Sequence, residues 1–241
     1  AAGPVVLARP RAGFDVLFAQ VAAQLQAKGV DIRLGARLER IERKDGEFLV
    51  TTSAGVFRVA RVISSLPLTM TAEACGLAAP AIIQSLPLLT LYVAHDGDLG
   101  FTSQVLYNFT PEGSWKRLTV HSRVYGQVSG RDYFSVEVPL ALGPRDPDAE
   151  FAAFLEFMRE RGLLAGHTML VGHERTDFAY PTYAHGSMAA SEALIEAVEA
   201  TGVEMLGRQG RFDYIPTSSR ATELVAERLG NSAREGSAVR S

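Results

Sequence analysis

Glycine and hydroxyl residues near the end of the chain have the spacing of a ligand-binding turn. In the segment 202–230 a short apolar run is followed by Gly207 and Gly210, where the backbone could approach a ligand closely. Thr217 and Ser218 come next and offer capping oxygens to a helix. A helix start favours an anion or an electron-rich carbonyl, because it carries free N–H groups and the positive end of a dipole. The segment predicts a cofactor site, with an ordinary strand–turn–helix connection as the alternative.

An uncharged segment earlier in the chain has the composition of a buried strand. Residues 62–67 are rich in β-branched side chains and stop at a proline, which predicts a strand buried on both faces. The C-terminal ends of such strands are where ligands bind in parallel α/β sheets. Ser64 and Ser65 are small enough to leave room for a ligand at this end.

The composition excludes several classes of protein. The 241 residues are 47% hydrophobic, which is enough for a full core. A formal net charge of −3 gives no reason to expect nucleic acid or an anionic membrane as a partner. No apolar run approaches the ~20 residues of a membrane helix. The single cysteine, Cys75, rules out a disulfide framework and fits a reducing compartment, so we expect a cytoplasmic protein.

Periodicity and turn residues predict the order of the elements. The chain begins with an amphipathic helix whose apolar stripe faces inward, and continues into a small antiparallel meander. Longer, aromatic-rich strands occupy the middle, and two helices lie near the end. The predicted helices start at residues 14, 148, 187 and 216, and the predicted strands cover 30–34, 37–43, 48–52, 56–60, 62–67, 88–95, 104–109, 116–122, 133–138 and 168–173. The last helix should end at Gly230.

The connections between these elements were assigned from their turn residues. Asp96 to Gly100 is interpreted as a hairpin turn, and residues 179–183 as a loop. The tail at 231–241 is small, polar and aperiodic, which predicts disorder.

Three segments in this order resemble the C-terminal part of the flavin-containing amine oxidase superfamily, which includes protoporphyrinogen oxidases, phytoene desaturases and UDP-galactopyranose mutases. They are the proline–glycine helix start at residues 10–13, the strand at 62–67, and Gly207–Gly210 with Phe212 and Tyr214. The resemblance implies a mixed α/β and α+β fold. A partial FAD-binding Rossmann-like domain (1–67 and 176–230) would be interrupted by a substrate-binding domain (68–175) with a mixed or antiparallel sheet.

The resemblance also implies which residues contact FAD. Leu38 would touch the adenine through its backbone, and the end of the strand at 62–67 would lie beside the cofactor. The last helix would be aimed at the pyrimidine edge of the flavin, where its start would stabilise the reduced ring. The implied cofactor-binding residues are Leu38, Ser64, Ser65, Leu66, Pro67, Gly207, Arg208, Gly210, Phe212, Ile215, Pro216, Thr217 and Ser218.

The sequence departs from the family in one important respect. These flavoproteins begin with a strand and a G-x-G-x-x-G turn that holds the pyrophosphate, and this chain has no such motif. We therefore expect FAD binding by this chain alone to be weak or absent. The expected partners are a small-molecule substrate and a missing N-terminal FAD-binding segment or a partner chain, and a homo-oligomer is a further option.

Aromatic and polar residues of the middle segment could line a substrate face packed over the flavin, although each could equally fill the core of the sheet. They are Tyr92, Tyr107, Phe109, Trp115, His121, Arg123, Tyr125 and Tyr133. Arg123 and Tyr183 are the candidate catalytic residues, because strand-end arginines and loop tyrosines often orient substrates. The five histidines lack the spacing of metal ligands, so no metal site is expected.

These observations favour an FAD-dependent oxidoreductase that passes a hydride from a substrate carbon to the flavin. Two alternatives stay open. One is a non-catalytic binding or assembly module that kept the fold, which would expose an apolar face and dimerise or need a partner. The other is a mutase-like flavoenzyme.

Overall fold

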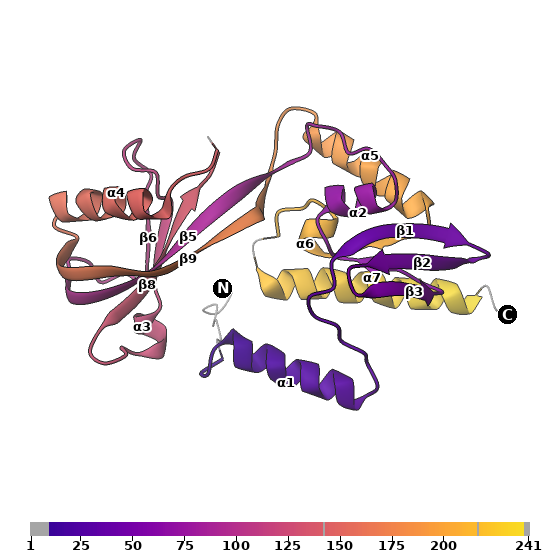
Figure 1. Ribbon diagram of the computed structural model, residues 1–241, viewed down its shortest axis with the longest axis horizontal. Helices are drawn as coiled ribbons and strands as arrows, with labels where there is room; N and C mark the ends of the chain where they lie inside the picture. Colours follow the sequence, from indigo (N-terminus) through magenta and orange to yellow (C-terminus); the bar gives the residue numbers. More distant parts are fainter. Residues whose placement is uncertain (1–9, 142, 216, 239–241) are drawn as a thin grey trace, which may run out of the picture.

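A computed structural model describes residues 10–141, 143–215 and 217–238, with the side chains of 231–238 left aside. The described chain forms two lobes (Figure 1). One lobe consists of a five-stranded sheet covered by α4, and the other contains the smaller sheets with α2, α5, α6 and α7. The polypeptide passes between the lobes along two long strands, β5 and β9, which pair with each other.

The large sheet is antiparallel throughout, in the order β6-β7-β8-β5-β9. Its strands are β5 (Gln84–Leu99), β6 (Val105–Tyr107), β7 (Arg117–Val120), β8 (Asp132–Pro139) and β9 (Leu164–Thr182). Burial alternates along β8, where Phe134, Val136 and Val138 are buried while the residues between them are partly exposed. This alternation is typical of a sheet with one face on the core and the other open.

Helix α4 (Pro147–Glu160) covers the buried face of the large sheet. The helix begins one residue before the predicted start at 148; Asp146 is its N-cap and accepts a hydrogen bond from the Asp148 backbone N–H. The helix contributes three buried side chains to the first core, and the ring of Trp115 meets two of them edge-on. This first core consists of Leu89, Leu91, Val93, Trp115, Leu118, Val120, Phe134, Val136, Val138, Leu140, Phe154, Phe157, Met158 and Leu164.

The second lobe has its own core, built around two small sheets. Strands β1 (Leu38–Lys44), β2 (Glu47–Thr52) and β3 (Gly55–Val59) form an antiparallel meander, while β4 (Ile63–Ser64) and β10 (Glu204–Met205) form a parallel pair. Helices α2 (Leu68–Ala74), α5 (Ser187–Ala200) and α6 (Gly207–Gly210) pack with them. The second core consists of Ile41, Phe48, Leu68, Ala72, Ala74, Ile83, Leu194, Ile195, Val198, Val203, Met205 and Phe212.

The mixture of helices with antiparallel and parallel sheets confirms the predicted fold class. The division into a cofactor part and a substrate part remains our proposal. Helix α2, which the sequence analysis assigned to the middle segment, packs in the second core with α5. The chain therefore enters the large sheet only after Ile83.

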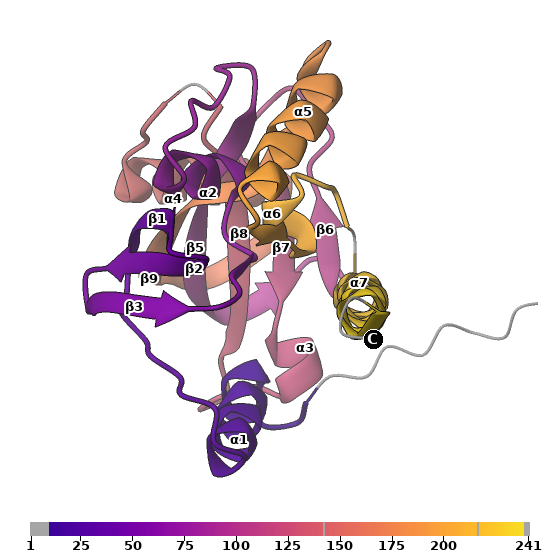
Figure 2. The ribbon, with the colours of Figure 1, turned by 90° about the vertical axis from the view of Figure 1, so that its right-hand side faces the viewer.

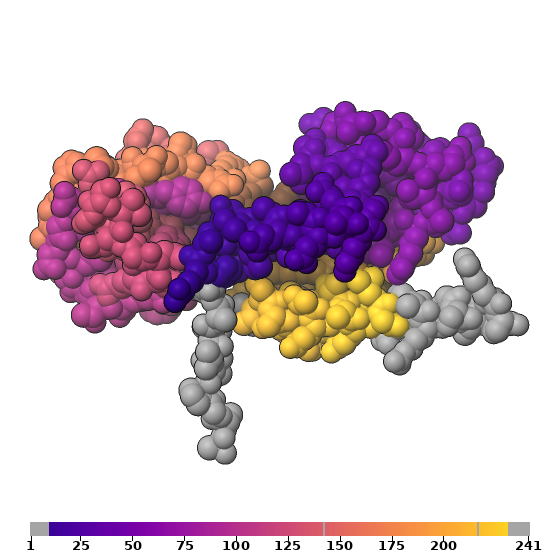
Figure 3. Space-filling view, turned by 90° about the horizontal axis from the view of Figure 1, so that it is seen from below, coloured from indigo at the N-terminus to yellow at the C-terminus, as the bar shows by residue number. Residues whose placement is uncertain are grey.

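Helix α1 (Phe14–Ala27) contains no buried residue, although its apolar stripe was expected to face inward. Phe18 is 65% exposed and stacks on Phe14, with the ring centroids 6.2 Å apart. Figure 3 shows the helix on the outside of the molecule. The expectation is wrong because the described chain does not bury this stripe, whose apolar side chains are all partly exposed.

Three predicted elements are corrected by the structure. Residues 30–34 form no strand; they are irregular and are followed by a turn before β1. Asp96 to Gly100 is not a hairpin turn, because β5 continues to Leu99. Residues 180–182 belong to β9 rather than to a loop. In the last two cases, cross-strand pairing along β5 and β9 overrides the local turn residues.

Helix α7 (Ser218–Ala238) continues past Gly230, where the sequence predicted its end. A single exposed glycine weakens a helix by roughly 1 kcal/mol but does not stop it. The helix thus covers residues 231–238 of the segment for which disorder was predicted, and the last three residues lie outside the described part. Among the described residues, no helix is both long and apolar enough to cross a membrane.

Candidate functional site

The structure brings together the two segments from which a cofactor site was predicted. Strands β4 and β10 pair in parallel: Glu204 N–H donates to the Val62 carbonyl at 3.0 Å, and Leu206 N–H donates to the Ser64 carbonyl at 2.9 Å. Both strands therefore end at the same edge, and Gly207 and Ser65 face each other there. Ligands of α/β proteins bind at such an edge.

The strand at 62–67 is shorter and less buried than its composition predicts. Only Ile63 and Ser64 belong to β4, and Ile63 is 42% exposed. Ser64 is buried, and its hydroxyl lies 2.7 Å from the Thr71 hydroxyl. The Leu66 N–H donates to the Ser64 hydroxyl at 3.3 Å. The prediction of burial on both faces is wrong because the pair has only two described strands, which leaves one face of β4 uncovered.

Helix α6 packs tightly on the end of β4. A Cβ atom added to Gly210 would lie 3.0 Å from the Ser64 carbonyl oxygen and 3.4 Å from the methyl carbon of Met205. Gly207, at the start of the helix, has φ +73°, a conformation that side chains rarely adopt. Glycine at 210 allows the close contact with Ser64, and glycine at 207 allows the positive φ. Both features keep α6 at the edge where β4 and β10 end.

Replacing Gly210 with alanine is expected to destabilise the protein by about 1–3 kcal/mol, because the new methyl group overpacks the contact with Ser64. Urea unfolding measured by circular dichroism checks this. Gly230→Ala is the matched control, since a Cβ at that exposed helical position meets nothing within 4 Å. The control should be neutral or stabilise by up to about 1 kcal/mol; equal effects of the two substitutions would contradict the packing argument.

Residues after α6 continue around the same edge. Phe212 is buried with φ +50°, and its ring meets that of Tyr183 edge-on with the centroids 6.0 Å apart. The Tyr183 hydroxyl donates to the Phe212 carbonyl at 3.4 Å, and Ile215 is buried. Phe212 and Ile215 thus form part of the packing of the second lobe. Pro216 lies outside the described residues.

Thr217 is the residue that caps α7. Its hydroxyl oxygen accepts the Arg220 N–H at 3.3 Å, and its carbonyl accepts the Ala221 N–H at 3.1 Å. Thr217 and Ser218 are exposed. The helix start predicted from the sequence therefore exists, and it opens to solvent rather than into packed protein.

The remaining predicted cofactor residues lie at different distances from this edge. Pro67 precedes α2 as its N-cap, directly after the β4 end. Leu38 lies in the three-stranded meander, partly buried against the second core. Arg208 projects from α6 toward β9, where its guanidinium donates to the Ala179 carbonyl at 3.2 Å. The Gln209 side-chain amide likewise donates a hydrogen bond to the Phe178 carbonyl of β9, so α6 also connects the two lobes.

A group of charged and aromatic side chains gathers around Tyr180, where β9 reaches α6. The Lys116 ammonium lies 4.5 Å from the centre of the Tyr180 ring, and the Arg208 guanidinium lies 5.4 Å from the same centre. The Tyr180 hydroxyl donates to Glu137 at 3.4 Å. We call this group the Tyr180 cluster; its members are Lys116, Arg117, Glu137, Tyr180, Arg208 and Tyr214.

Burial and charge both act on the titration of the cluster. Burial raises the pKa of Tyr180, and the negative charge of Glu137 raises it further against the opposing effects of Arg117 and Arg208. Burial alone would lower the pKa of Arg117, but its hydrogen bond and ion pair with Glu137 raise it. The cluster thus contains three basic side chains and one acidic side chain.

The candidate catalytic residues are not brought together. Arg123 lies on α3 (Ser122–Tyr125), where its guanidinium donates to the Phe101 carbonyl. Tyr183 lies just before α5, and Figures 1 and 2 both show α3 and α5 well apart, with α3 in the lobe of the large sheet and α5 in the second lobe. Arg123 and Tyr183 therefore remain separate candidates, and of the two it is Tyr183 that lies near α6, where its hydroxyl contacts the Phe212 carbonyl.

The aromatic residues of the middle segment divide between the two faces of the sheet. Trp115 is buried in the first core, whereas Tyr92 is partly exposed and donates to Glu174 at 3.2 Å. Tyr107 stacks on Phe109, which is 90% exposed. The His121 ring lies 2.9 Å from the Ser135 hydroxyl. Lys116, Arg117, Glu137 and Tyr180 were not predicted as site residues, although the alternation of polar residues along β7 and β8 marks the open face.

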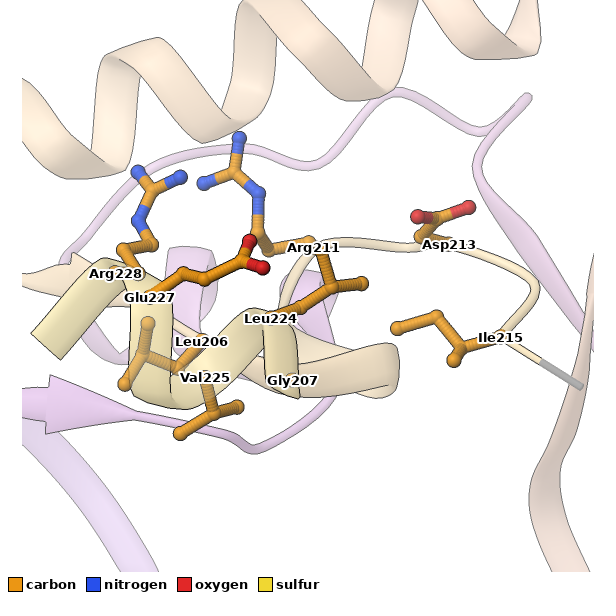
Figure 4. A pocket seen from close by; sticks show the side chains of 9 residues that line it. All are labelled: Leu206, Gly207, Arg211, Asp213, Ile215, Leu224, Val225, Glu227 and Arg228. Carbon is orange, nitrogen blue, oxygen red and sulfur yellow. The ribbon is translucent and has the colours of Figure 1, made fainter. Parts of the chain in front are cut away.

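A pocket of about 300 Å³ lies between α6 and α7 (Figure 4). Its floor is apolar, and its rim carries Arg211 and Arg228, which both bind the Glu199 carboxylate of α5. The pocket is lined by Leu206, Gly207, Arg211, Asp213, Ile215, Leu224, Val225, Glu227 and Arg228. No group of three or more His, Cys, Asp or Glu side chains in the described part of the chain could hold a metal ion.

Chains of known structure share this fold. The superposition on a reduced UDP-galactopyranose mutase has a TM-score of 0.70 at 19% identity and covers 82% of this chain and 45% of that chain. A putative protoporphyrinogen oxidase from Exiguobacterium sp. 255-15 gives 0.64 at 16% identity, with coverages of 83% and 47%. A putrescine oxidase triple mutant gives 0.58 at 11% identity, with coverages of 90% and 52%. No protein-family model and no curated protein matches the sequence.

These comparisons define the class of the fold. The chain shares its fold with parts of structures described as a UDP-galactopyranose mutase, a putative protoporphyrinogen oxidase and a putrescine oxidase, as its motifs predicted. It resembles the UDP-galactopyranose mutase structure with the higher TM-score of the three. The chain spans about half the length of each of these solved structures.

Proposed function

We propose that this chain supplies the substrate-binding sheet and the C-terminal part of the cofactor site of an FAD-dependent oxidoreductase of the amine oxidase type. One observation carries the proposal: β4 and β10 end together, with α6 between that edge and the open face of the large sheet. The fold shared with flavoenzymes of known structure supports it. A cytoplasmic location, suggested by the single unpaired Cys75, is part of the proposal.

The residues at the edge fit a large anionic cofactor. Arg208 follows Gly207 at this edge, but its guanidinium is directed toward β9, where it donates to the Ala179 carbonyl, so it is not counted among the residues that would hold FAD. The start of α7, capped by Thr217 and exposed, provides the positive end of a helix dipole. Ser65 and Gly207 leave small surfaces at the strand ends. These residues, with Leu66 and Ser218, would hold FAD, which when bound accepts a hydride from a substrate carbon.

The remaining work of the site falls to the protein itself. The helix start would stabilise negative charge beside it by roughly 0.3–1 kcal/mol, more where it is covered. The open face of the large sheet would position the substrate, and the contacts of Arg208 and Gln209 with β9 hold that face against α6.

Flavin measurements test this proposal at two levels. Fluorescence titration of FAD with the purified chain should show weak binding or none, because the chain lacks a G-x-G-x-x-G phosphate-binding turn. The tagged chain isolated from its natural source should carry FAD together with a further polypeptide segment. Tight stoichiometric binding of FAD by the purified chain would contradict the proposal that another segment is needed to bind the pyrophosphate. A natural assembly without flavin would contradict the proposal that FAD is the cofactor.

A second candidate function is a non-catalytic assembly module, and the open apolar face of α1 favours it. Contiguous exposed apolar patches often mark interaction sites, so this face fits a partner in either function. Light scattering distinguishes a self-associating module from a monomer that needs a different partner. A dimer that forms without flavin and whose natural assembly contains none would support the module, whereas flavin in that assembly supports the oxidoreductase. A mutase-like use of FAD is distinguished by a substrate screen.

A further inference from the structure

The Tyr180 cluster has an excess of positive charge that the chain does not neutralise within it. Lys116, Arg117 and Arg208 are basic, and among the described residues Glu137 is the carboxylate that contacts them. Glu137 is already engaged, since it pairs with Arg117 and accepts the Tyr180 hydroxyl. Like charges near one another repel, and a bound anion would relieve this repulsion.

The cations of the cluster converge on one side chain. Lys116 from the large sheet and Arg208 from α6 both lie against the ring of Tyr180, at 4.5 and 5.4 Å from its centre. The Arg208 guanidinium also lies 5.3 Å from the Tyr214 ring. Cation–π contacts of this kind stabilise the charges only in part, because the rings carry no net charge.

Two donors in the cluster are unused. The Nε atoms of Arg117 and Arg208 are buried and have no hydrogen-bond partner among the described residues. An unpaired buried donor destabilises a protein, which is a reason to expect an acceptor that the described chain does not provide. A guanidinium is well suited to bind the two oxygens of a carboxylate or phosphate.

We propose that the Tyr180 cluster binds an oxyanion of the substrate, a carboxylate or a phosphate, between Lys116 and Arg208. The inference rests on the proposed function, because it takes the open face of the large sheet as the substrate face. Arg208 lies next to Gly207 at the β4–β10 edge, so an anion held there places the rest of the substrate beside the cofactor site. The rings of Tyr180 and Tyr214 offer flat apolar surfaces next to the charge.

Binding of three small probes to the purified full chain tests the proposal. Benzoate and phenyl phosphate carry the two oxyanions, and benzamide is the neutral match. We expect millimolar or tighter binding of at least one anion, measured by calorimetry and by NMR shifts of residues around Tyr180, and none of benzamide. The tighter of the two anions identifies the oxyanion. Equal binding of benzamide, or no shifts with either anion up to about 10 mM, would overturn the proposal.

Substitution of Lys116 locates the site. Lys116→Gln should weaken binding of the anion about tenfold, Lys116→Arg should restore it, and the exposed Lys44→Gln on the meander should leave it unchanged. An equal loss with Lys44→Gln would overturn the assignment. The experiment contains no flavin, so anion binding that survives a failed FAD test would retain the site while rejecting the oxidoreductase.

Discussion

Replacing Gly97 with alanine is expected to destabilise the large sheet by about 3 kcal/mol or more, because the backbones of β5 and β9 lie too close together there to leave room for a side chain. Gly97 of β5 pairs directly with Gly166 of β9. A Cβ at Gly97 would lie 2.1 Å from the Ala165 carbonyl oxygen and 2.9 Å from the Gly166 Cα. Both atoms belong to the backbone, so the clash cannot be relieved by rotating a neighbouring side chain.

Urea unfolding followed by the fluorescence of Trp115 measures this effect. Trp115 is the single tryptophan and is buried in the core of the same sheet, so its signal reports on that lobe. Gly172→Ala on β9 is the matched control, because a Cβ there meets nothing within 4 Å. A loss of stability as small as that of the control would show that the two strands do not approach as closely as described.

Phe134→Ala is expected to destabilise the same lobe by about 3–5 kcal/mol. Phe134 is 1% exposed in the first core, where its ring lies 6.1 Å from that of Phe154. Removing the ring loses its burial and leaves a cavity that the surrounding strands and helix fill only in part.

The neighbouring residue is the matched control for the face of the sheet. Tyr133→Ala removes an aromatic ring from the adjacent position of β8, which points to the open face. Its expected effect is about 1 kcal/mol or less, measured by the same urea titration. If both substitutions cost the same, the large sheet does not have one packed and one open face.

The positions of most helices and strands were predicted from the sequence better than the lengths of the strands or the burial of the helices. Strand periodicity located β5, β7 and β8, the proline–glycine pattern at residues 10–13 located the start of α1, and the helix predicted from residue 187 is α5. The lengths of β5 and β9 could not be read locally, because their ends are held by pairing with each other rather than by their own propensities. The prediction that the apolar stripe of α1 faces inward was wrong for a related reason, because burial depends on what packs against a helix and not on the helix's own sequence.

The candidate site shows the same division. The glycine and serine segments were linked by resemblance alone, and β4–β10 pairing then placed them side by side. The Tyr180 cluster escaped the sequence analysis because its members come from β7, β8, β9 and α6. Residues separated by tens of positions meet only when sheet order and register are known.

Pro87 interrupts the long ribbon through which the two lobes are joined. The register of β5 against β9 shifts between Leu86 and Leu88, and a proline contributes no N–H to a strand ladder. A two-stranded ribbon bends most easily where a hydrogen bond is already missing. The segment that joins the lobes therefore lacks a backbone donor at the point where its register shifts, and the contacts of Arg208 and Gln209 with β9 add a second connection between the lobes.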